Sequence, residues 1–229
     1  MNPFLLLLLC AAAAHRNEIL AQGTKHSTDK VTAHTYHHLY NHFLPRIRLH
    51  NVKLLEIGLG CNMNSGSASI NLWQAYFPRL DLWMADIDTT CAAKVQNTTK
   101  NTILIGDQGK EADLLRFIEE SGGEFDVIVD DGSHIPAHQM ESFRVLFSRA
   151  LKPGGLYFME DIESPDRTLC DVPFVPDTGI RDRVIYWTDQ LLRWPRDLHA
   201  DVPEGLMAIA VQSEMAVFMK CPLKERCPR

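Results

Sequence analysis

The sequence predicts an α/β fold of the Rossmann-like type, with helices on both faces of a seven-stranded, mostly parallel sheet. Three observations predict it. Runs rich in Val, Ile and Leu alternate with helical stretches of about ten residues, as in a parallel sheet buried on both faces. Several of these runs end in glycine or in an acidic residue. Near the C-terminus, two apolar runs are separated only by Gln212–Glu214, a spacing typical of an antiparallel hairpin.

The expected elements follow in order along the chain. A His-rich stretch, His26–His42, carries aromatic residues at helical spacing and predicts one or two short helices before the core. The predicted parallel strands are Val52–Ile57, Leu80–Asp86, Thr102–Ile105, Phe125–Val129 and Leu156–Met159. The predicted helices between them are Ser69–Phe77, Lys110–Ser121 and His138–Leu151, which stop at proline or glycine. The predicted C-terminal hairpin consists of Leu206–Val211 and Met215–Met219.

Length, charge and cysteine content narrow the class of protein. A chain of 229 residues suits one domain with a sizeable core. The net charge is −6 and Lys and Arg are scattered, which argues against nucleic acid as a partner because phosphate binding needs a concentrated basic surface. The six cysteines lack the spacing of a zinc site. Cys221 and Cys227 are close enough in sequence to close a small loop as a disulfide.

The N-terminus carries an apolar run, Phe4–Ala14, that is shorter than the roughly 20 residues of a membrane span. We expect a secretory signal peptide or N-terminal anchor over residues 1–22, the main domain over 23–220 and a tail over 221–229. A signal peptide would make the protein secreted, with membrane contact only through an uncleaved leader. A buried or amphipathic first helix is the alternative, and it would leave the protein cytoplasmic.

Glycines and acids follow the first three predicted strands. Glu56 and Gly58 end the first strand, where glycine lets the backbone approach a nucleoside closely. A dinucleotide-dehydrogenase fingerprint would need a third glycine where Met63 stands, and a tight turn is the simpler alternative for the motif alone. Asp86, or in second place Asp88, could accept the ribose hydroxyl hydrogens. The pair Asp107-Gln108 could meet an adenine edge, or Asp107 could simply form a turn.

The densest polar cluster follows the fourth and fifth predicted strands, as Asp130-Asp131-Gly132-Ser133-His134 and Glu160-Asp161. Open α/β sheets place their ligands at this edge. Carboxylates that converge there repel one another unless a cation neutralises them, and oxygen ligands favour Mg²⁺. His134 could act as a general base, because imidazole titrates near neutral pH. The alternative is that these acids cap the following helices.

Taken together, the motifs resemble those of Mg²⁺-dependent sugar O-methyltransferases that tailor macrolides and tetracenomycins, a branch of the class I S-adenosylmethionine-dependent enzymes. The likeness runs from about residue 23 to residue 165 and more loosely to residue 220. The segments that carry it are Thr28-Asp29-Lys30, His34-Thr35-Tyr36, Leu55-Glu56-Ile57-Gly58, Gly106-Asp107-Gln108, Asp130-Asp131-Gly132-Ser133-His134 and Pro153-Gly154-Gly155 with Glu160-Asp161.

The resemblance implies a methyltransferase domain over residues 23–220, with a role for each candidate residue. S-adenosylmethionine would be held by Glu56, Gly58, Asp86, Asp107, Gln108 and Asp130. Mg²⁺ would be held by Asp131, Glu160 and Asp161, with His134 as the base. The acceptor would be a hydroxyl of a sugar, glycan or small polyol, and the chain could form a homo-oligomer. The alternatives are a catechol-type methyltransferase and a secreted, non-catalytic interaction protein that kept the fold.

Overall fold

The computed structural model describes residues 17–61, 68–162, 179–193 and 201–223. The chain falls into two compact units, a smaller one of residues 1–52 with 60–81 and a larger one of residues 53–59 with 82–229. The sequence predicts one domain over residues 23–220, and its boundary at residue 22 falls inside helix α2 (Glu18–His26). Residues 1–16 of the predicted leader, and Cys227, lie outside the described residues.

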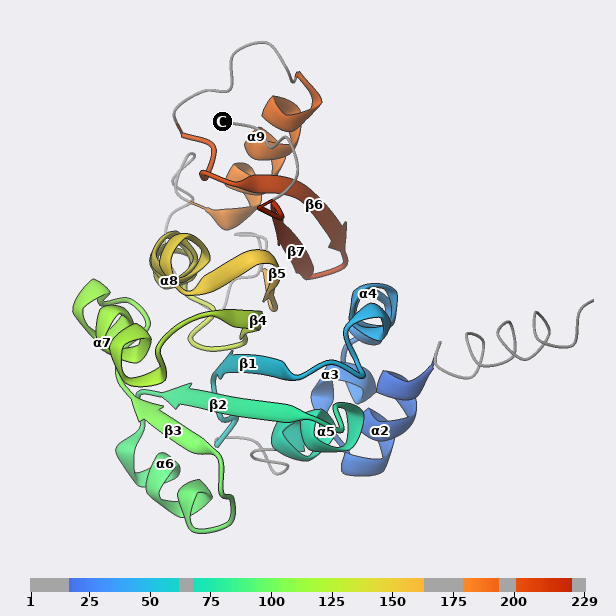
Figure 1. The fold of residues 1–229 in the computed structure, drawn as a ribbon, viewed down its shortest axis with the longest axis vertical. Helices are drawn as coiled ribbons and strands as arrows, with labels where there is room; N and C mark the ends of the chain where they lie inside the picture. Colours follow the sequence, from blue (N-terminus) through green and yellow to red (C-terminus); the bar gives the residue numbers. More distant parts are fainter. Residues whose placement is uncertain (1–16, 62–67, 163–178, 194–200, 224–229) are drawn as a thin grey trace, which may run out of the picture. The chain divides into compact units, whose positions relative to one another are not determined.

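The sheet has seven strands in the order β3-β2-β1-β4-β5-β7-β6 (Figure 1). β4 pairs in parallel with both β1 and β5, and β2 pairs in parallel with β3. β7 is antiparallel to β5 and to β6, so the last two strands form a hairpin at the edge. This topology confirms the predicted fold class. The strands are β1 (Val52–Ile57), β2 (Leu80–Asp86), β3 (Thr102–Ile105), β4 (Phe125–Asp130), β5 (Leu151–Met159), β6 (Leu206–Gln212) and β7 (Met215–Lys220).

The fifth strand begins earlier than the sequence predicts, at Leu151 instead of Leu156. Helix α8 (Pro136–Arg149) accordingly ends before the Pro153-Gly154-Gly155 segment, which lies within the strand. Proline lacks an N–H group and enters a sheet only at edges or irregularities. The pairing of β4 with β5 shifts register between Phe125 and Val127, and this irregularity accommodates the segment.

The larger unit contains two helices that the sequence analysis does not predict, α6 (Thr89–Gln96) and α9 (Ile180–Leu192). Asp88 caps the first of them, because its carboxylate accepts the N–H groups of Thr90 at 2.8 Å and Cys91 at 3.0 Å. An Asp immediately before Thr89 is a sequence signal for a helix start, so this helix could have been found.

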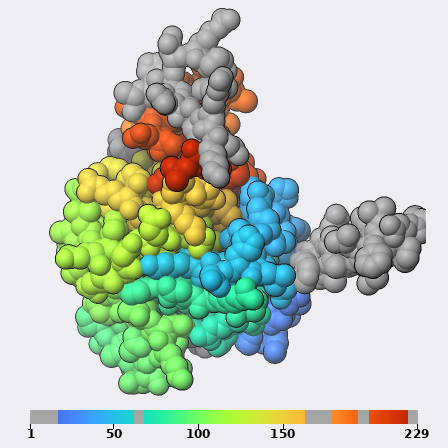
Figure 2. All heavy atoms as spheres, in the orientation of Figure 1, coloured from blue at the N-terminus to red at the C-terminus, as the bar shows by residue number. Residues whose placement is uncertain are grey.

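The core of the larger unit is centred on Phe143 of α8. Its ring lies 4.5 Å from that of Phe218 in β7, 5.1 Å from Tyr157 in β5 and 5.4 Å from Trp187 in α9, between ring centroids. All four side chains are buried, and each contributes roughly 1.5–3 kcal/mol through the apolar surface it removes from water. Helix α7 (Glu111–Ser121) packs beside α8, and Figure 2 shows the green-to-yellow atoms of this region as one continuous surface.

The smaller unit is helical, with an aromatic core. Tyr40 meets the ring of Trp73 edge-on at 5.1 Å, and both are fully buried. Arg48 donates to the main-chain oxygen of Tyr76 at 2.9 Å. No helix in the described ranges has both the length and the apolar character that crossing a bilayer requires. Besides α2, the helices here are α3 (Asp29–Thr32), α4 (His37–Phe43), the 3₁₀ helix η1 (Leu44–Arg46) and α5 (Ala68–Tyr76).

The C-terminus of α8 is held by Lys220 of β7, which yields a stability prediction. The ammonium group donates to the main-chain oxygens of Phe147 at 2.7 Å, Ser148 at 3.0 Å and Leu151 at 2.7 Å. Helix ends leave such carbonyls without partners, so Lys220→Met should lower the free energy of unfolding by about 1–3 kcal/mol. Urea denaturation measures this. The exposed Lys94→Met is the matched control, and an equal effect of both changes would contradict the capping role.

Candidate active site

Three polar side chains of the larger unit meet at the carboxyl ends of β4 and β5. Asp131 and His134 follow β4, and Asp161 follows β5. One ligand atom from each of the three lies within 4.8 Å of the others. Nε2 of His134 is 3.8 Å from Oδ2 of Asp161, and both side chains are partly open to solvent. The structure therefore places the predicted base close to two of the predicted metal ligands.

Two of these residues adopt a backbone conformation that is uncommon outside glycine. His134 has φ +55° and Asp161 has φ +50°. Residues held in the left-handed region cost of order 1–3 kcal/mol and collect at functional sites. Within the described chain, the buried Nδ1 atom of His134 has no hydrogen-bond partner, whereas its Nε2 lies near the Asp161 carboxylate.

Glu160, the third predicted metal ligand, is not part of this group. It is fully buried, its N–H donates to the Asp130 carbonyl at 2.9 Å and its carbonyl accepts from Gln139 Nε2 at 3.0 Å. Glu160 and Asp161 both follow β5, which ends at Met159, and Asp161 has a left-handed backbone with φ +50°, so strand alternation does not describe this pair. The set that the structure brings together is Asp131, His134 and Asp161.

Gly58 directly follows β1 and lies against the main chain of Asp131. Gly58 has φ +101°, and a Cβ atom there would lie 2.0 Å from the main-chain oxygen of Asp131. The N–H of Asp131 in turn donates to the carbonyl of Ile57 at 3.0 Å. Glycine is therefore required here for the close approach of the two strand ends. Glu56, two residues earlier, is buried within β1.

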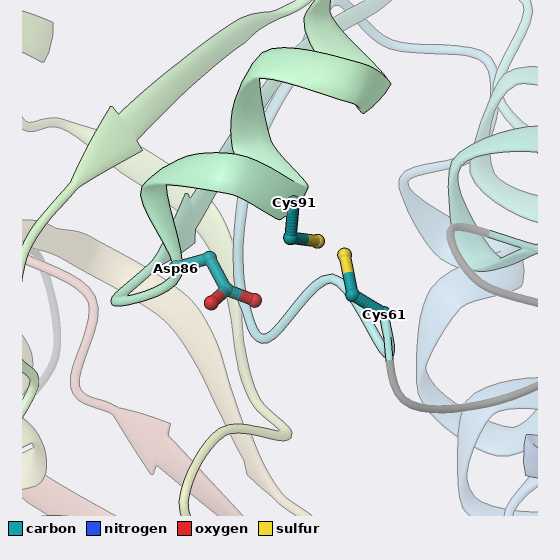
Figure 3. Close-up of side chains that lie close together, drawn as sticks. All are labelled: Cys61, Asp86 and Cys91. Carbon is teal, nitrogen blue, oxygen red and sulfur yellow. The ribbon is translucent and has the colours of Figure 1, made fainter.

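The carboxylate of Asp86 lies at the end of β2 and links two loops. Its Oδ2 accepts the N–H of Leu59 and its Oδ1 accepts the N–H of Asp88, both at 2.8 Å. The Asp88 carboxylate instead caps α6, and the nucleoside-binding role of Asp86 stays a prediction. Figure 3 shows the Asp86 carboxylate with the side chains of Cys61 and Cys91, and each of these cysteines is disulfide-bonded, as is Cys221.

The segment after β3 carries one residue that forms a turn and one that is buried. Asp107 accepts the N–H of Gly109 at 2.9 Å and pairs with Lys110 at 3.4 Å, as the turn alternative predicts. Gln108 is only 6% exposed, and its Nε2 donates to Oδ1 of Asp130 at 2.8 Å. Its Oε1 accepts the N–H of Ser133 at 2.7 Å.

Asp130 is fully buried, and the sequence analysis missed two of its partners. Ser142 of α8 and Tyr157 of β5 donate to its Oδ2, the tyrosine at 2.8 Å. Burial raises the pKa of the Asp130 carboxyl, while the hydrogen bonds from Ser142, Tyr157 and Gln108 oppose that rise. Burial, together with the nearby Asp130 charge, raises the pKa of the Tyr157 phenol well above its ordinary value. The sequence signal that could have identified this network is that Ser142 and Tyr157 carry hydroxyl groups among the buried residues of α8 and β5.

The sequence of this chain is similar to the sequences of curated sugar O-methyltransferases. A scan against models of known protein families gives no match. The 8-demethyl-8-(2-methoxy-alpha-L-rhamnosyl)-tetracenomycin-C 3'-O-methyltransferase of Streptomyces olivaceus is 33% identical over 159 residues, which make up 68% of this chain and 40% of the relative. The mycinamicin VI 2''-O-methyltransferase of Micromonospora griseorubida is 36% identical over 126 residues, 54% of this chain and 30% of the relative.

A solved structure gives the same likeness in three dimensions. The MycE methyltransferase of the mycinamycin biosynthetic pathway, in complex with Mg, SAH and mycinamycin VI, matches with a TM-score of 0.73 and 25% identity. The match covers 91% of this chain and 56% of that one. The resemblance stated from the motifs is thus confirmed, and the fold is that of a methyltransferase. The chain spans about two fifths of the length of the first two curated relatives (40% and 41%).

The contact between Gly58 and Asp131 gives a second prediction. Gly58→Ala adds both left-handed strain and a backbone clash, whereas Gly122→Ala adds the strain alone, since nothing lies within 4 Å of a Cβ at that position. The first change should therefore lower the free energy of unfolding by roughly 1–3 kcal/mol more than the second. Chemical denaturation of both variants checks this, and equal losses would show that the two strand ends do not make this contact.

Proposed function

We propose that this chain is the catalytic part of a Mg²⁺-dependent O-methyltransferase that uses S-adenosylmethionine to methylate a hydroxyl of a sugar or small polyol. The observation that carries the proposal is the group of Asp131, His134 and Asp161 at adjacent parallel strand ends. The named activities of the curated relatives and the Mg and SAH bound to MycE support it. Because the chain spans less than half of those curated relatives, the acceptor remains part of the proposal.

The donor atoms fit a hard divalent cation. Asp131 and Asp161 supply carboxylate oxygens, the ligand type that Mg²⁺ prefers, and both are accessible to solvent in part. Asp131 and Asp161 would hold the ion, and the resemblance adds Glu160, which is fully buried, as a third ligand. When bound, Mg²⁺ would lower the pKa of a chelated acceptor hydroxyl and orient it.

The residues at the carboxyl ends of β1 and β2 fit the methyl donor. Asp86 accepts one main-chain N–H on each oxygen, and a carboxylate oxygen has a second lone pair, so it can still accept the ribose hydroxyls. Gly58 keeps the turn after β1 free of a side chain. We assign donor binding to Gly58, Asp86 and Asp107, and Glu56 is buried within β1 next to this turn.

The chemistry is a direct methyl transfer. The acceptor oxygen attacks the methyl carbon of the sulfonium in line, so that the C–O bond forms as the C–S bond breaks and leaves a thioether. Nε2 of His134 takes the hydroxyl proton, and the Asp161 carboxylate 3.8 Å away stabilises the resulting imidazolium. His134 and Asp161 both have a left-handed backbone conformation, which persists only where surrounding contacts maintain it, so the contacts around them would set this separation before substrate binds.

Several expectations from the sequence stay predictions. Entry into the secretory pathway rests on the apolar run Phe4–Ala14, which lies outside the described residues. Assembly into a homo-oligomer and membrane contact through the N-terminal segment also stay predictions.

Substitution of His134 tests the proposed base. His134→Ala should lower methyl transfer by about 10²–10⁴-fold, because the proton then has no acceptor, while the affinity for S-adenosylmethionine stays unchanged. Calorimetric titration of the full chain measures binding, and S-adenosylhomocysteine release with a rhamnosylated tetracenomycin measures transfer. The exposed His50→Ala is the control. Retained activity in His134→Ala would contradict the assignment.

Metal removal tests the acid pair. A chelator should abolish transfer by the full chain, and added Mg²⁺ should restore it. Asp131→Asn should raise the Mg²⁺ concentration needed for half-maximal rate by at least about tenfold, since one of two ligand charges is lost. The exposed Asp201→Asn should leave that concentration unchanged. Full activity in chelator would remove the metal from the proposal.

A further inference from the structure

A chain of buried hydrogen bonds runs from the core to the loop that carries His134. It starts at Asp130, whose Oδ2 accepts from Ser142 and from Tyr157. Oδ1 of the same carboxylate accepts from Nε2 of Gln108 at 2.8 Å. These donors come from α8, from β5 and from the segment after β3, so the carboxylate joins three separate elements directly beneath the site.

The other end of the Gln108 side chain reaches the loop itself. Its Oε1 accepts the N–H of Ser133 at 2.7 Å, one residue before His134. A Cβ atom at Gly132 would lie 1.8 Å from that oxygen, so only glycine allows the approach. On the far side, Oγ of Ser133 lies 3.1 Å from Nδ1 of His138 and accepts the N–H of Ile135 at 3.4 Å. The loop is thus held on both sides of His134.

The polarity of these contacts requires an amide at position 108. Both oxygens of Asp130 accept hydrogen bonds, and the main-chain N–H of Ser133 can only donate one. The side chain between them must therefore donate at one end and accept at the other, as a carboxamide does. Asp130 in this way fixes which end of Gln108 faces the loop.

We infer that Gln108, oriented by Asp130, is a positioning residue that holds the turn from Asp131 to Ile135 and so sets His134 against Asp161. This inference rests on the proposed function and deepens it. The resemblance implies instead that Gln108 and Asp130 bind the methyl donor. Both side chains are buried, at 6% and 0% exposed, and their polar atoms are engaged with one another.

The strain at His134 explains why the loop needs such a hold. Its φ of +55° is retained only where surrounding contacts oppose relaxation. Without an acceptor at position 108, the N–H of Ser133 would lose its partly buried hydrogen bond, and the loop could relax toward ordinary backbone angles. His134 would then move from Asp161, and proton removal would slow while the donor still bound.

An exchange of the two polar groups tests this directly. Gln108→Glu keeps the acceptor for Ser133 but places two carboxylates against each other. Adding Asp130→Asn restores a donor–acceptor pair of reversed polarity, because the new amide nitrogen can donate to Glu at 108 while its oxygen still accepts from Ser142 and Tyr157. The total charge of the pair also returns to its original value.

The single and double variants have distinct expected results. Gln108→Glu should lower kcat by about 10–100-fold with unchanged affinity for S-adenosylmethionine. The double variant should recover kcat to within about fivefold of wild type, since the two changes are coupled. Weakened donor binding in both variants would overturn the inference and assign Gln108 to the donor site, as would a double variant no more active than Gln108→Glu.

A readout without turnover separates this inference from the proposed function. In the wild-type full chain, the Ser133 amide should exchange with solvent about 100-fold or more slowly than an open amide, and Gln108→Leu should remove that protection. Fast exchange in the wild type would overturn the positioning role even if no variant folds. A wild type that protects Ser133 but transfers no methyl group would overturn the proposed function while supporting the hold of Gln108 on the loop.

Discussion

The buried carboxylate of Asp130 is the constraint on which the larger unit depends at its functional edge. A carboxyl group in the core is costly unless its oxygens accept hydrogen bonds. Here Gln108, Ser142 and Tyr157 donate these hydrogen bonds from three separate elements. Gln108 is the donor to Oδ1, and Ser142 and Tyr157 share Oδ2, so loss of Gln108 would leave one buried oxygen without its partner. Asp131 and the loop that leads to His134 are connected to this network through the hydrogen bond from the Ser133 N–H to Gln108.

Close backbone approach is the second requirement. Gly58 lets the end of β1 touch the main chain of Asp131, and Gly132 lets Gln108 reach Ser133. Both contacts exclude a Cβ atom, so each glycine is explained by a neighbour inside the protein. These contacts lie on the segment that carries His134, whose left-handed conformation they help to maintain, and ligand atoms of Asp131, His134 and Asp161 lie within 4.8 Å of one another.

Several parts of the fold and the site could be read from residue patterns alone. The limits of β1, β2 and β3 agree with the predicted ones, because each is a short apolar run bounded by turn residues. Asp131, His134 and Asp161 were selected because parallel strands end at one edge of a sheet. The start of β5 was misplaced because Pro153 and Gly154 normally end an element, and only pairing with β4 shows that they lie within a strand. The role of Asp88 as the N-cap of α6 could also be predicted from the sequence, because Asp is a common residue at that position.

The sequence by itself determined which acids, glycines and histidine follow which strands. It could do so because strand periodicity and chain order are local properties. What only the tertiary structure decided is the direction in which each side chain points. Glu160 and Asp161 are neighbours in sequence, yet Glu160 is fully buried and Asp161 lies near His134, and the left-handed backbone of Asp161 after the end of β5 is a feature that the sequence does not reveal. Gln108 and Asp130 are 22 positions apart, and their hydrogen bond depends on β3 and β4 being folded into one sheet with α8 packed against them. Contacts between distant segments follow from packing, which no local pattern records.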